Sequence, residues 1–258
     1  MRLNYTLPNG FKYAPYLLEL IEGNHVLIAG TVGAGKSVLE NAIINSILCT
    51  KYPGQTADGN GAKLVLIDPK RVELRMYKDL PHTLYYADNL PDIERTLSNV
   101  RALIEARFIR MQREGIRTST ECPIYIFIDE LVDLATNKQH GKEIMRLLAD
   151  CASISRACRC FFICLTQSPA RVIIPAQLKL LFNCRVALRC NNSIESRQII
   201  DDDSATTLPR HGFAVVQNNL DRYKMKVDII PDSQLTAIVT HWKKQHPIIN
   251  ALTRQKLK

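Results

Sequence analysis

The sequence predicts an α/β fold in which a mostly parallel central sheet carries helices on both faces and ends in a C-terminal β-hairpin. Two observations lead to this prediction. Short apolar runs alternate along the chain with longer segments in which apolar residues recur at helical spacing, and this alternation is typical of parallel sheets. The last two strand-like segments are separated by Asn218-Asn219, a pair that favours a tight turn between antiparallel strands.

The first expected strand, residues 25–29, leads into a glycine-rich loop. The loop Gly30-Thr31-Val32-Gly33-Ala34-Gly35-Lys36-Ser37 fills the pattern G-x-x-x-x-G-K-[ST] of phosphate-binding loops, and helical spacing follows it over residues 37–49. Strand, loop and helix in this order turn backbone N–H groups and the positive end of a helix dipole toward phosphate oxygens. We therefore expect Lys36 to reach the β and γ phosphates of ATP and the Ser37 hydroxyl to bind Mg²⁺. An ordinary glycine-rich turn is the alternative, and the complete pattern disfavours it.

Further strands and helices follow in alternation. The strands are expected at residues 63–67, 124–128, 160–165 and 185–190, and the hairpin at residues 213–216 and 223–228. The helices are expected at residues 90–115, 143–158 and 232–246. Since the carboxyl ends of parallel strands meet at one edge of a sheet, a single site is expected to unite Gly30, Asp68, Asp129 and Thr166-Gln167.

The longest helical pattern, residues 90–115, has an apolar stripe and a basic remainder. The stripe is interpreted as core packing, and it contains Ile93, Leu97, Val100, Ile104, Phe108 and Met111. The basic residues are interpreted as a solvated face, with nucleic-acid contact as the less favoured alternative, and they are Arg95, Arg101, Arg107 and Arg110.

An Asp-Glu pair follows the apolar run of residues 124–128. Asp129 is placed to hold the Mg²⁺ shell opposite Ser37, and Glu130 is placed to orient and polarise the attacking water as a general base. Gln167 ends the next strand, where its side chain is expected to hydrogen-bond the γ-phosphate or the water. The alternative for Gln167 is a polar strand terminus without a role in the chemistry.

Arg156 lies near the end of the helix that precedes the strand at residues 160–165. Phosphoryl transfer spreads negative charge over the γ-phosphate, so such enzymes often recruit an arginine from the same chain or from a neighbouring subunit. Arg156 is a candidate for this role. The alternative is a favourable interaction with the negative C-terminus of its own helix, and the sequence leaves both interpretations open.

Composition and charge narrow the class of partner. The 258 residues carry a net charge of +9 and are 46% hydrophobic, which suits a sizeable core and an anionic partner, with nucleic acid ranked before acidic lipid. The chain shows neither an apolar run of transmembrane length nor a signal-peptide region, so we expect a cytoplasmic protein. Four of the eight cysteines cluster without a C-x-x-C pair and are interpreted as small buried hydrophobes rather than a metal site: Cys151, Cys158, Cys160 and Cys164.

Five segments resemble the motor domain of FtsK/SpoIIIE-type DNA translocases. They are residues 25–45, 66–74, 126–134, 165–167 and 194–200, and the resemblance extends from about residue 25 to residue 228. The D-P-K-x-V-E-L pattern within residues 66–74 and the S-R-x-I-[IL] pattern within residues 194–200 are more specific than the phosphate loop. The resemblance implies a RecA-like P-loop NTPase that assembles as a hexameric ring around double-stranded DNA, with ATP between subunits. We expect a lead-in over residues 1–22, the motor domain over residues 23–230, and a C-terminal helix with a basic tail over residues 231–258.

The resemblance also implies roles for single residues. Lys36, Ser37, Asp129, Glu130 and Gln167 match the family positions of the roles given above. Arg156 resembles the arginine that a subunit supplies in trans to its neighbour's ATP. Further matches concern DNA: Lys179 and Arg197 fall at positions whose side chains face DNA in the pore, and Arg171 lies near a position where the family has an arginine and this chain has Ser168. A family lysine is replaced by Ser193.

The build implied by the resemblance is a stand-alone motor, similar to the translocases of phages and integrative elements, without a membrane-spanning region or a DNA-reading winged helix. Contacts to phosphates carry no sequence information, so a recruiting membrane or DNA-binding protein is expected to supply specificity. Two alternatives stay open. One is a related secretion or assembly ATPase that acts on protein substrates, and the other is a nucleotide-binding assembly protein without turnover.

Overall fold

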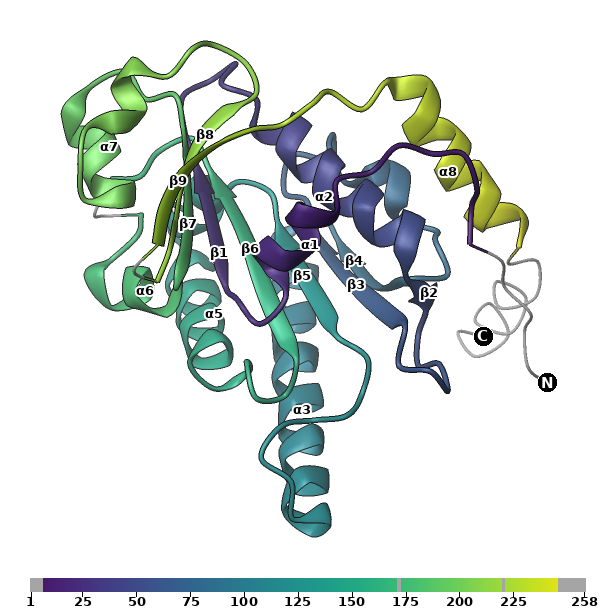
Figure 1. Ribbon diagram of the computed structural model, residues 1–258. Coiled ribbons are helices and arrows are strands. Elements are labelled where there is room, and N and C mark those ends of the chain that lie inside the picture. Colours follow the sequence, from purple (N-terminus) through teal and green to yellow (C-terminus); the bar gives the residue numbers. More distant parts are fainter. Residues whose placement is uncertain (1–6, 171–172, 220, 246–258) are drawn as a thin grey trace.

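The computed structural model describes residues 7–170, 173–219 and 221–245 (Figure 1). Over these residues a nine-stranded sheet has the order β2-β3-β5-β6-β1-β7-β8-β9, and β4 also pairs with β3. The strands are β1 (Val26–Ala29), β2 (Tyr52–Pro53), β3 (Gly61–Ile67), β4 (Thr83–Ala87), β5 (Ile124–Ile128), β6 (Cys160–Thr166), β7 (Cys184–Leu188), β8 (Phe213–Asn218) and β9 (Asp221–Lys226). Strands β1 to β7 pair in parallel, and the β8–β9 hairpin adds two antiparallel strands, which confirms the predicted fold class.

Helices cover both faces of this sheet. α1, α2 and α8 lie on one face, and α3 and α5 lie on the other (Figure 1). The helices are α1 (Pro15–Ile21), α2 (Lys36–Thr50), α3 (Leu90–Glu114), α4 (Leu131–Ala135), α5 (Gly141–Ile154), α6 (Ala176–Leu181), α7 (Ser193–Ile200) and α8 (Asp232–Lys244), with short 3₁₀ turns η1 (Arg75–Tyr77) and η2 (Ser204–Thr207). Because both faces are covered, every residue of β1, β5 and β6 is buried, and these strands read as continuous apolar runs.

The order of the central strands sets the layout of the site. β6 lies between β1 and β5 and is parallel to both, with Thr166 opposite Ala29 and Cys164 opposite Ile128. The residues that follow β6 therefore lie between the loop after β1 and the Asp-Glu pair after β5. The four strand ends that the sequence predicted to share a site do share this edge of the sheet.

Both ends of the described chain pack on the sheet face that α2 covers. α1 buries Leu17, Leu20 and Ile21 in the same core cluster as α2. α8 buries Trp242, whose indole N–H donates to the carbonyl of Leu48 at 2.9 Å. The sequence pattern predicted α8 but not α1, since a helix of seven residues is too short to show a helical period. The basic tail over residues 246–258 lies outside the described residues.

One arginine of α3 departs from the predicted solvated face. Arg107 is 4% exposed, and its guanidinium donates to the carbonyls of Cys158 at 2.6 Å and Cys122 at 2.9 Å. The prediction of a solvated side chain is wrong here, because these two carbonyls are buried against α3 and the guanidinium is the donor that satisfies them. The remaining arginines of the set are partly or fully exposed: Arg95, Arg101 and Arg110.

The clustered cysteines lie in the core, as predicted. All eight cysteines of the described chain are buried and none forms a disulfide. Burial raises the pKa of each clustered thiol, that of Cys158 to about 11, so these groups stay neutral and pack as small apolar side chains. Within the described ranges, no helix has the length and apolar character needed to cross a membrane.

Candidate functional site

The phosphate loop connects the end of β1 to the start of α2, and its glycines are required by its shape. Gly35 has a φ of 103°, a left-handed conformation that favours glycine. At Gly30 the loop passes so close to β7 that an added Cβ would lie 2.7 Å from the Cβ of Leu188. The Thr31 N–H donates to the carbonyl of Arg189 at 3.0 Å, which fastens the loop to the residue after β7.

Lys36 lies inside this loop. Its ammonium donates to the carbonyls of Gly30 at 2.8 Å and Thr31 at 3.0 Å. Burial lowers the pKa of Lys36, while the nearby carboxylates of Glu130 and Asp129 raise it. The Lys36 ammonium is therefore held within the loop by two neutral carbonyl acceptors. Charged phosphate oxygens would form stronger hydrogen bonds with it.

The two predicted metal ligands lie in an acidic part of the site. The Ser37 hydroxyl donates to Oε1 of Glu73 at 2.8 Å. Asp129 is 9% exposed, and its Oδ2 is buried without a hydrogen-bond partner in the structure. Burial first, and then the charges of Asp68, Glu73 and Glu130, raise the pKa of Asp129 to about 7 against the lowering effect of Lys70.

The oxygens of Ser37 and Asp129 are suitable ligands for Mg²⁺. The ion prefers oxygen ligands, and a buried carboxylate oxygen without a partner next to other carboxylates is short of positive charge. Within the described part of the chain, no three His, Cys, Asp or Glu side chains are arranged to hold a metal ion by themselves. Mg²⁺ is usually bound by one or two protein carboxylates and completes its shell with waters and substrate phosphates.

Glu130 is held from three sides. It precedes α4 with a φ of 79°, which is uncommon for a residue with a side chain, and it is 2% exposed. Its Oε1 accepts from the Thr166 hydroxyl at 3.1 Å and from the Gln167 N–H at 2.9 Å, and its Oε2 pairs with the Lys70 ammonium at 3.0 Å. A carboxylate with fixed orientation at this edge is what a general base for the attacking water requires.

The structure separates the two remaining predicted residues. Gln167 follows β6 between β1 and β5, and its side chain is exposed beside the nucleotide edge. Arg156 is also exposed, but it lies in the turn before β6, at the opposite edge of the sheet. β6 has seven residues, so about 20 Å of strand separate Arg156 from the phosphate loop of its own chain. α5 ends at Ile154, so Arg156 follows the helix that the sequence predicted to contain it. A role at the neighbouring subunit's ATP stays a prediction, as does an interaction of Arg156 with the C-terminus of α5.

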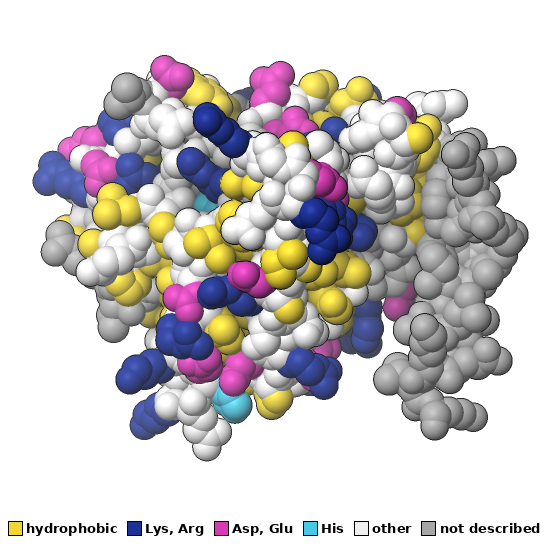
Figure 2. Space-filling view, turned by 90° about the horizontal axis from the view of Figure 1, so that it is seen from below, with side chains coloured by type: hydrophobic (Ala, Val, Ile, Leu, Met, Phe, Trp, Pro, Cys, Tyr) yellow, Lys and Arg dark blue, Asp and Glu magenta, His cyan; other side chains and the backbone are white. Residues whose placement is uncertain are grey.

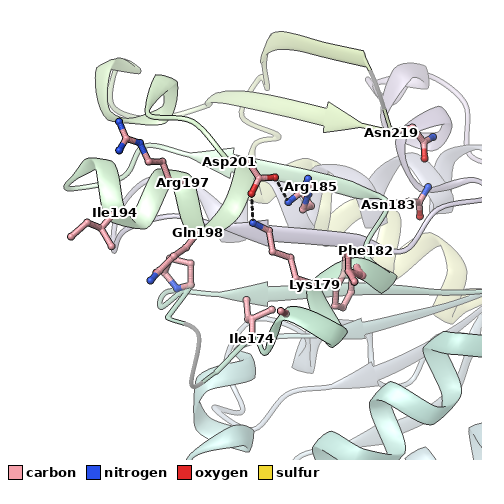
Figure 3. A pocket seen from close by; sticks show the side chains of 13 residues that line it. Ile174, Lys179, Phe182, Asn183, Arg185, Ile194, Arg197, Gln198, Asp201 and Asn219 are labelled. Carbon is pink, nitrogen blue, oxygen red and sulfur yellow. Dashed lines mark hydrogen bonds and ion pairs between the residues drawn. The ribbon is translucent and has the colours of Figure 1, made fainter.

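Two of the predicted DNA-facing residues, Lys179 and Arg197, line a cavity of about 860 Å³ between α6, α7 and β7 (Figure 3). Lys179 of α6 and Arg185 of β7 both point at Asp201, at 2.7 Å and 2.8 Å, whereas Arg197 of α7 points away from it (Figure 3). Arg197 is 64% exposed and lies 3.4 Å from Asp203. Arg171 lies outside the described residues.

The surface charge is mixed on the face that Figure 2 shows. Figure 2 views the molecule from the side toward which α3 projects, and on the described part of that face Lys and Arg side chains are interspersed with Asp and Glu. A polyanion would meet compensating acids over most of this face. The cations next to the cavity of Figure 3 are also paired with acids, Lys179 and Arg185 with Asp201 and Arg197 with Asp203.

Sequence reasoning gave no role to Lys70, Glu73, Arg185 or Asp201. The first two lie in the segment of residues 66–74 that marked the family resemblance, and this was the one available signal. Arg185 and Asp201 carry no recognisable pattern, since their contact depends on how α7 returns to β7.

The sequence of the chain is similar to those of known DNA translocases. The model of the FtsK/SpoIIIE family matches residues 1–122. A DNA translocase FtsK of Treponema pallidum is 31% identical over 88% of the chain, and one of Helicobacter pylori is 32% identical over 77%. The chain spans 30% and 24% of the lengths of these two relatives.

Solved structures show the same fold. The pCW3 conjugation coupling protein TcpA, solved as a monomer form with ATPγS, has a TM-score of 0.73 at 19% identity, and the match covers 91% of this chain and 75% of TcpA. ATPases 2 and 3 of EssC from Geobacillus thermodenitrificans have a TM-score of 0.72 at 17% identity, over 89% of this chain and 45% of EssC. These structural likenesses support a RecA-like P-loop ATPase fold. The sequence matches identify the chain as a member of the FtsK/SpoIIIE family.

Proposed function

We propose that the chain is an ATP-driven translocase of double-stranded DNA, which hydrolyses ATP at the subunit interfaces of a ring and moves the duplex through a central pore. One observation carries this proposal. Lys36, Ser37, Asp129 and Glu130 converge at one edge of the sheet in a chain whose curated relatives are named DNA translocases. A hexameric ring and a cytoplasmic location are parts of the same proposal.

The roles of the residues follow from their places. The loop N–H groups and Lys36 would bind the phosphates, and Ser37 and Asp129 would hold Mg²⁺, which neutralises charge on the phosphate oxygens when bound. Glu130 would accept the proton of the attacking water, with Gln167 beside it at the end of β6. Arg156 would complete the site of the adjacent subunit, because its own site lies at the far edge of the sheet.

The partner would be the DNA backbone. Lys179, Arg197 and Arg171 would contact phosphates, and binding would be independent of sequence and would weaken steeply with salt. A recruiting membrane protein or a DNA-binding protein would then choose the substrate.

The test is phosphate release by the purified chain with linear duplex, single-stranded DNA or no DNA. We expect the duplex to stimulate ATP hydrolysis more than the single strand does, and Lys36→Ala to remove hydrolysis under all three conditions. Hydrolysis that ignores DNA would contradict the proposal and would favour a relative that drives protein substrates. Nucleotide binding without any hydrolysis would favour an assembly protein.

The arginine is tested by mixing variants. Arg156→Ala and Lys36→Ala are each expected to be inactive, whereas their mixture should recover activity at interfaces that join an intact phosphate loop to an intact arginine. Arg146→Ala is the matched control, since it removes an exposed arginine of α5, the helix that precedes Arg156, and this arginine has its own surface partners. Absence of recovery in the mixture would exclude a role in trans.

A further inference from the structure

The loop of residues 68–74, between β3 and η1, touches both chemical halves of the nucleotide site. Glu73 accepts the hydrogen of the Ser37 hydroxyl at 2.8 Å. Lys70 pairs with Glu130 at 3.0 Å. A single short segment therefore contacts the predicted ligand of the metal and the predicted base.

This loop is anchored at both ends. Asp68 is fully buried, its Oδ2 accepts from the Leu74 N–H at 3.1 Å, and its N–H donates to the carbonyl of Ala87 in β4 at 2.9 Å. Its carbonyl accepts from the Arg71 N–H at 3.1 Å, which closes the turn. Leu74 is also fully buried. These contacts fix the backbone of the loop and therefore the positions from which the Lys70 and Glu73 side chains extend.

We propose that residues 68–74 form a positioning loop for ATP hydrolysis, in which Glu73 orients Ser37 toward the metal and Lys70 orients Glu130 toward the attacking water. The proposal rests on the proposed ATPase function. A hydroxyl that donates its hydrogen to Glu73 turns its oxygen lone pairs the other way, where the metal is expected. The arrangement also leaves Oδ2 of Asp129 without a competing partner.

Charge supports the assignment of Glu73 as an orienting group. Buried oxygens without a hydrogen-bond partner in the structure also occur on Asp68 and on Glu40 of α2, a side chain that is 1% exposed. Burial first, and then the charges of Asp129, Glu73 and Asp68, raise the pKa of Glu40, so these carboxylates act on one another. A bound divalent ion and its waters would supply the missing positive charge and donors. Glu73 is the member of this group that already holds a predicted metal ligand by a hydrogen bond.

Lys70 acts on the other half of the site. The Lys70 side chain is 35% exposed, whereas that of Glu130 is 2% exposed, so the lysine is the neutralising charge that reaches the buried carboxylate from the surface. The other oxygen of Glu130 is fixed by Thr166 and Gln167. With Lys70 in place the carboxylate plane is fixed at both oxygens, and without it the carboxylate can rotate about one end.

Glu73 is tested by binding, without hydrolysis. A fluorescent ATP analogue is titrated onto the protein at a series of Mg²⁺ concentrations and in EDTA. Glu73→Ala is expected to weaken the Mg²⁺-dependent part of binding about tenfold and to leave binding in EDTA unchanged. Glu73→Gln keeps an oxygen that accepts from Ser37 and is expected to stay within about threefold of the unchanged protein.

Two results of this experiment overturn the role of Glu73. One is an unchanged Mg²⁺ dependence in Glu73→Ala. The other is equal damage by Ala and Gln, which would assign the effect to charge and not to orientation. Glu105→Ala, an exposed acid on α3, is the matched control, and thermal unfolding of each variant verifies that it folds.

Lys70 is tested by separating kcat from KM. Lys70→Ala is expected to lower kcat at least tenfold with KM and nucleotide binding unchanged, and Lys70→Arg is expected to recover most of kcat because a guanidinium also pairs with Glu130. An unchanged kcat, or a loss carried by KM, overturns the role of Lys70. If the unchanged protein hydrolyses no ATP, the proposed function fails, while the binding experiment still decides the role of Glu73.

Discussion

Replacing Asp129 with asparagine is expected to stabilise the nucleotide-free protein above pH 7 while it removes ATP hydrolysis. The wild-type carboxylate is 9% exposed, and its Oδ2 has no hydrogen-bond partner in the structure. It also lies near the negative charges of Asp68, Glu73 and Glu130. Without a bound cation, its ionised form is therefore unfavourable in the folded state, and an uncharged amide removes this cost.

The size and the pH window follow from the pKa. Folding raises the pKa of Asp129 from 3.8 to about 7, so the folded protein keeps a proton that the unfolded chain has already released over this range. The destabilisation is absent below about pH 4, grows as the pH rises, and is complete above about pH 7. Its upper limit is roughly 4 kcal/mol, and we expect Asp129→Asn to recover about 2 to 4 kcal/mol at pH 8.

The measurement is urea unfolding of both proteins at pH 8 and pH 5 in EDTA. The advantage of Asp129→Asn should fall to less than half at pH 5, because most of the wild-type side chain is then protonated when folded. Asp133→Asn, an exposed acid on α4, is the control and should change the free energy of unfolding by less than about 0.5 kcal/mol at either pH. An Asp129→Asn protein that is no more stable at pH 8, or equally favoured at both pH values, would refute the reasoning.

Three further predictions concern other parts of the chain. Asp201→Asn releases the two cations that it pairs with, so duplex DNA should bind more tightly in fluorescence anisotropy, and the slope of log affinity against log salt should steepen by up to about 2; an unchanged slope would contradict this. Arg107→Ala leaves two buried carbonyls without their donor and should cost about 2 to 4 kcal/mol in urea unfolding, whereas exposed Arg95→Ala should cost less than about 0.5 kcal/mol. Trp242→Ala should cost about 3 to 5 kcal/mol by opening the contact between α8 and α2, and a loss below about 1 kcal/mol would mean that α8 is dispensable.

The predictable parts of the fold and site are those with a local signature. The phosphate loop and the acids after β5 follow apolar strands directly, and the rule that parallel strands end at one edge unites them. The missed parts depend on tertiary contacts. The period of α3 places Arg107 on the same face as Val100, Ile104 and Met111, and only its charge suggested a solvated position. The helix pattern does not show that two carbonyls from distant segments accept hydrogen bonds there. The roles of Glu73 and Lys70 likewise depend on contacts with residues distant in sequence, Ser37 and Glu130, which no local pattern shows.

The position of β6 has a mechanical consequence. At one end of this fully buried strand, the Gln167 N–H holds Glu130, and at the other end the turn that carries Arg156 is fastened by a hydrogen bond from the Cys160 N–H to the Ser155 carbonyl. If Arg156 acts on the ATP of the adjacent protomer as proposed, strand β6 directly links the nucleotide site of one protomer to that of the next. ATP hydrolysis in one protomer would then shift the arginine that completes the nucleotide site of the next protomer. The strand would in this way set the order of hydrolysis around the ring.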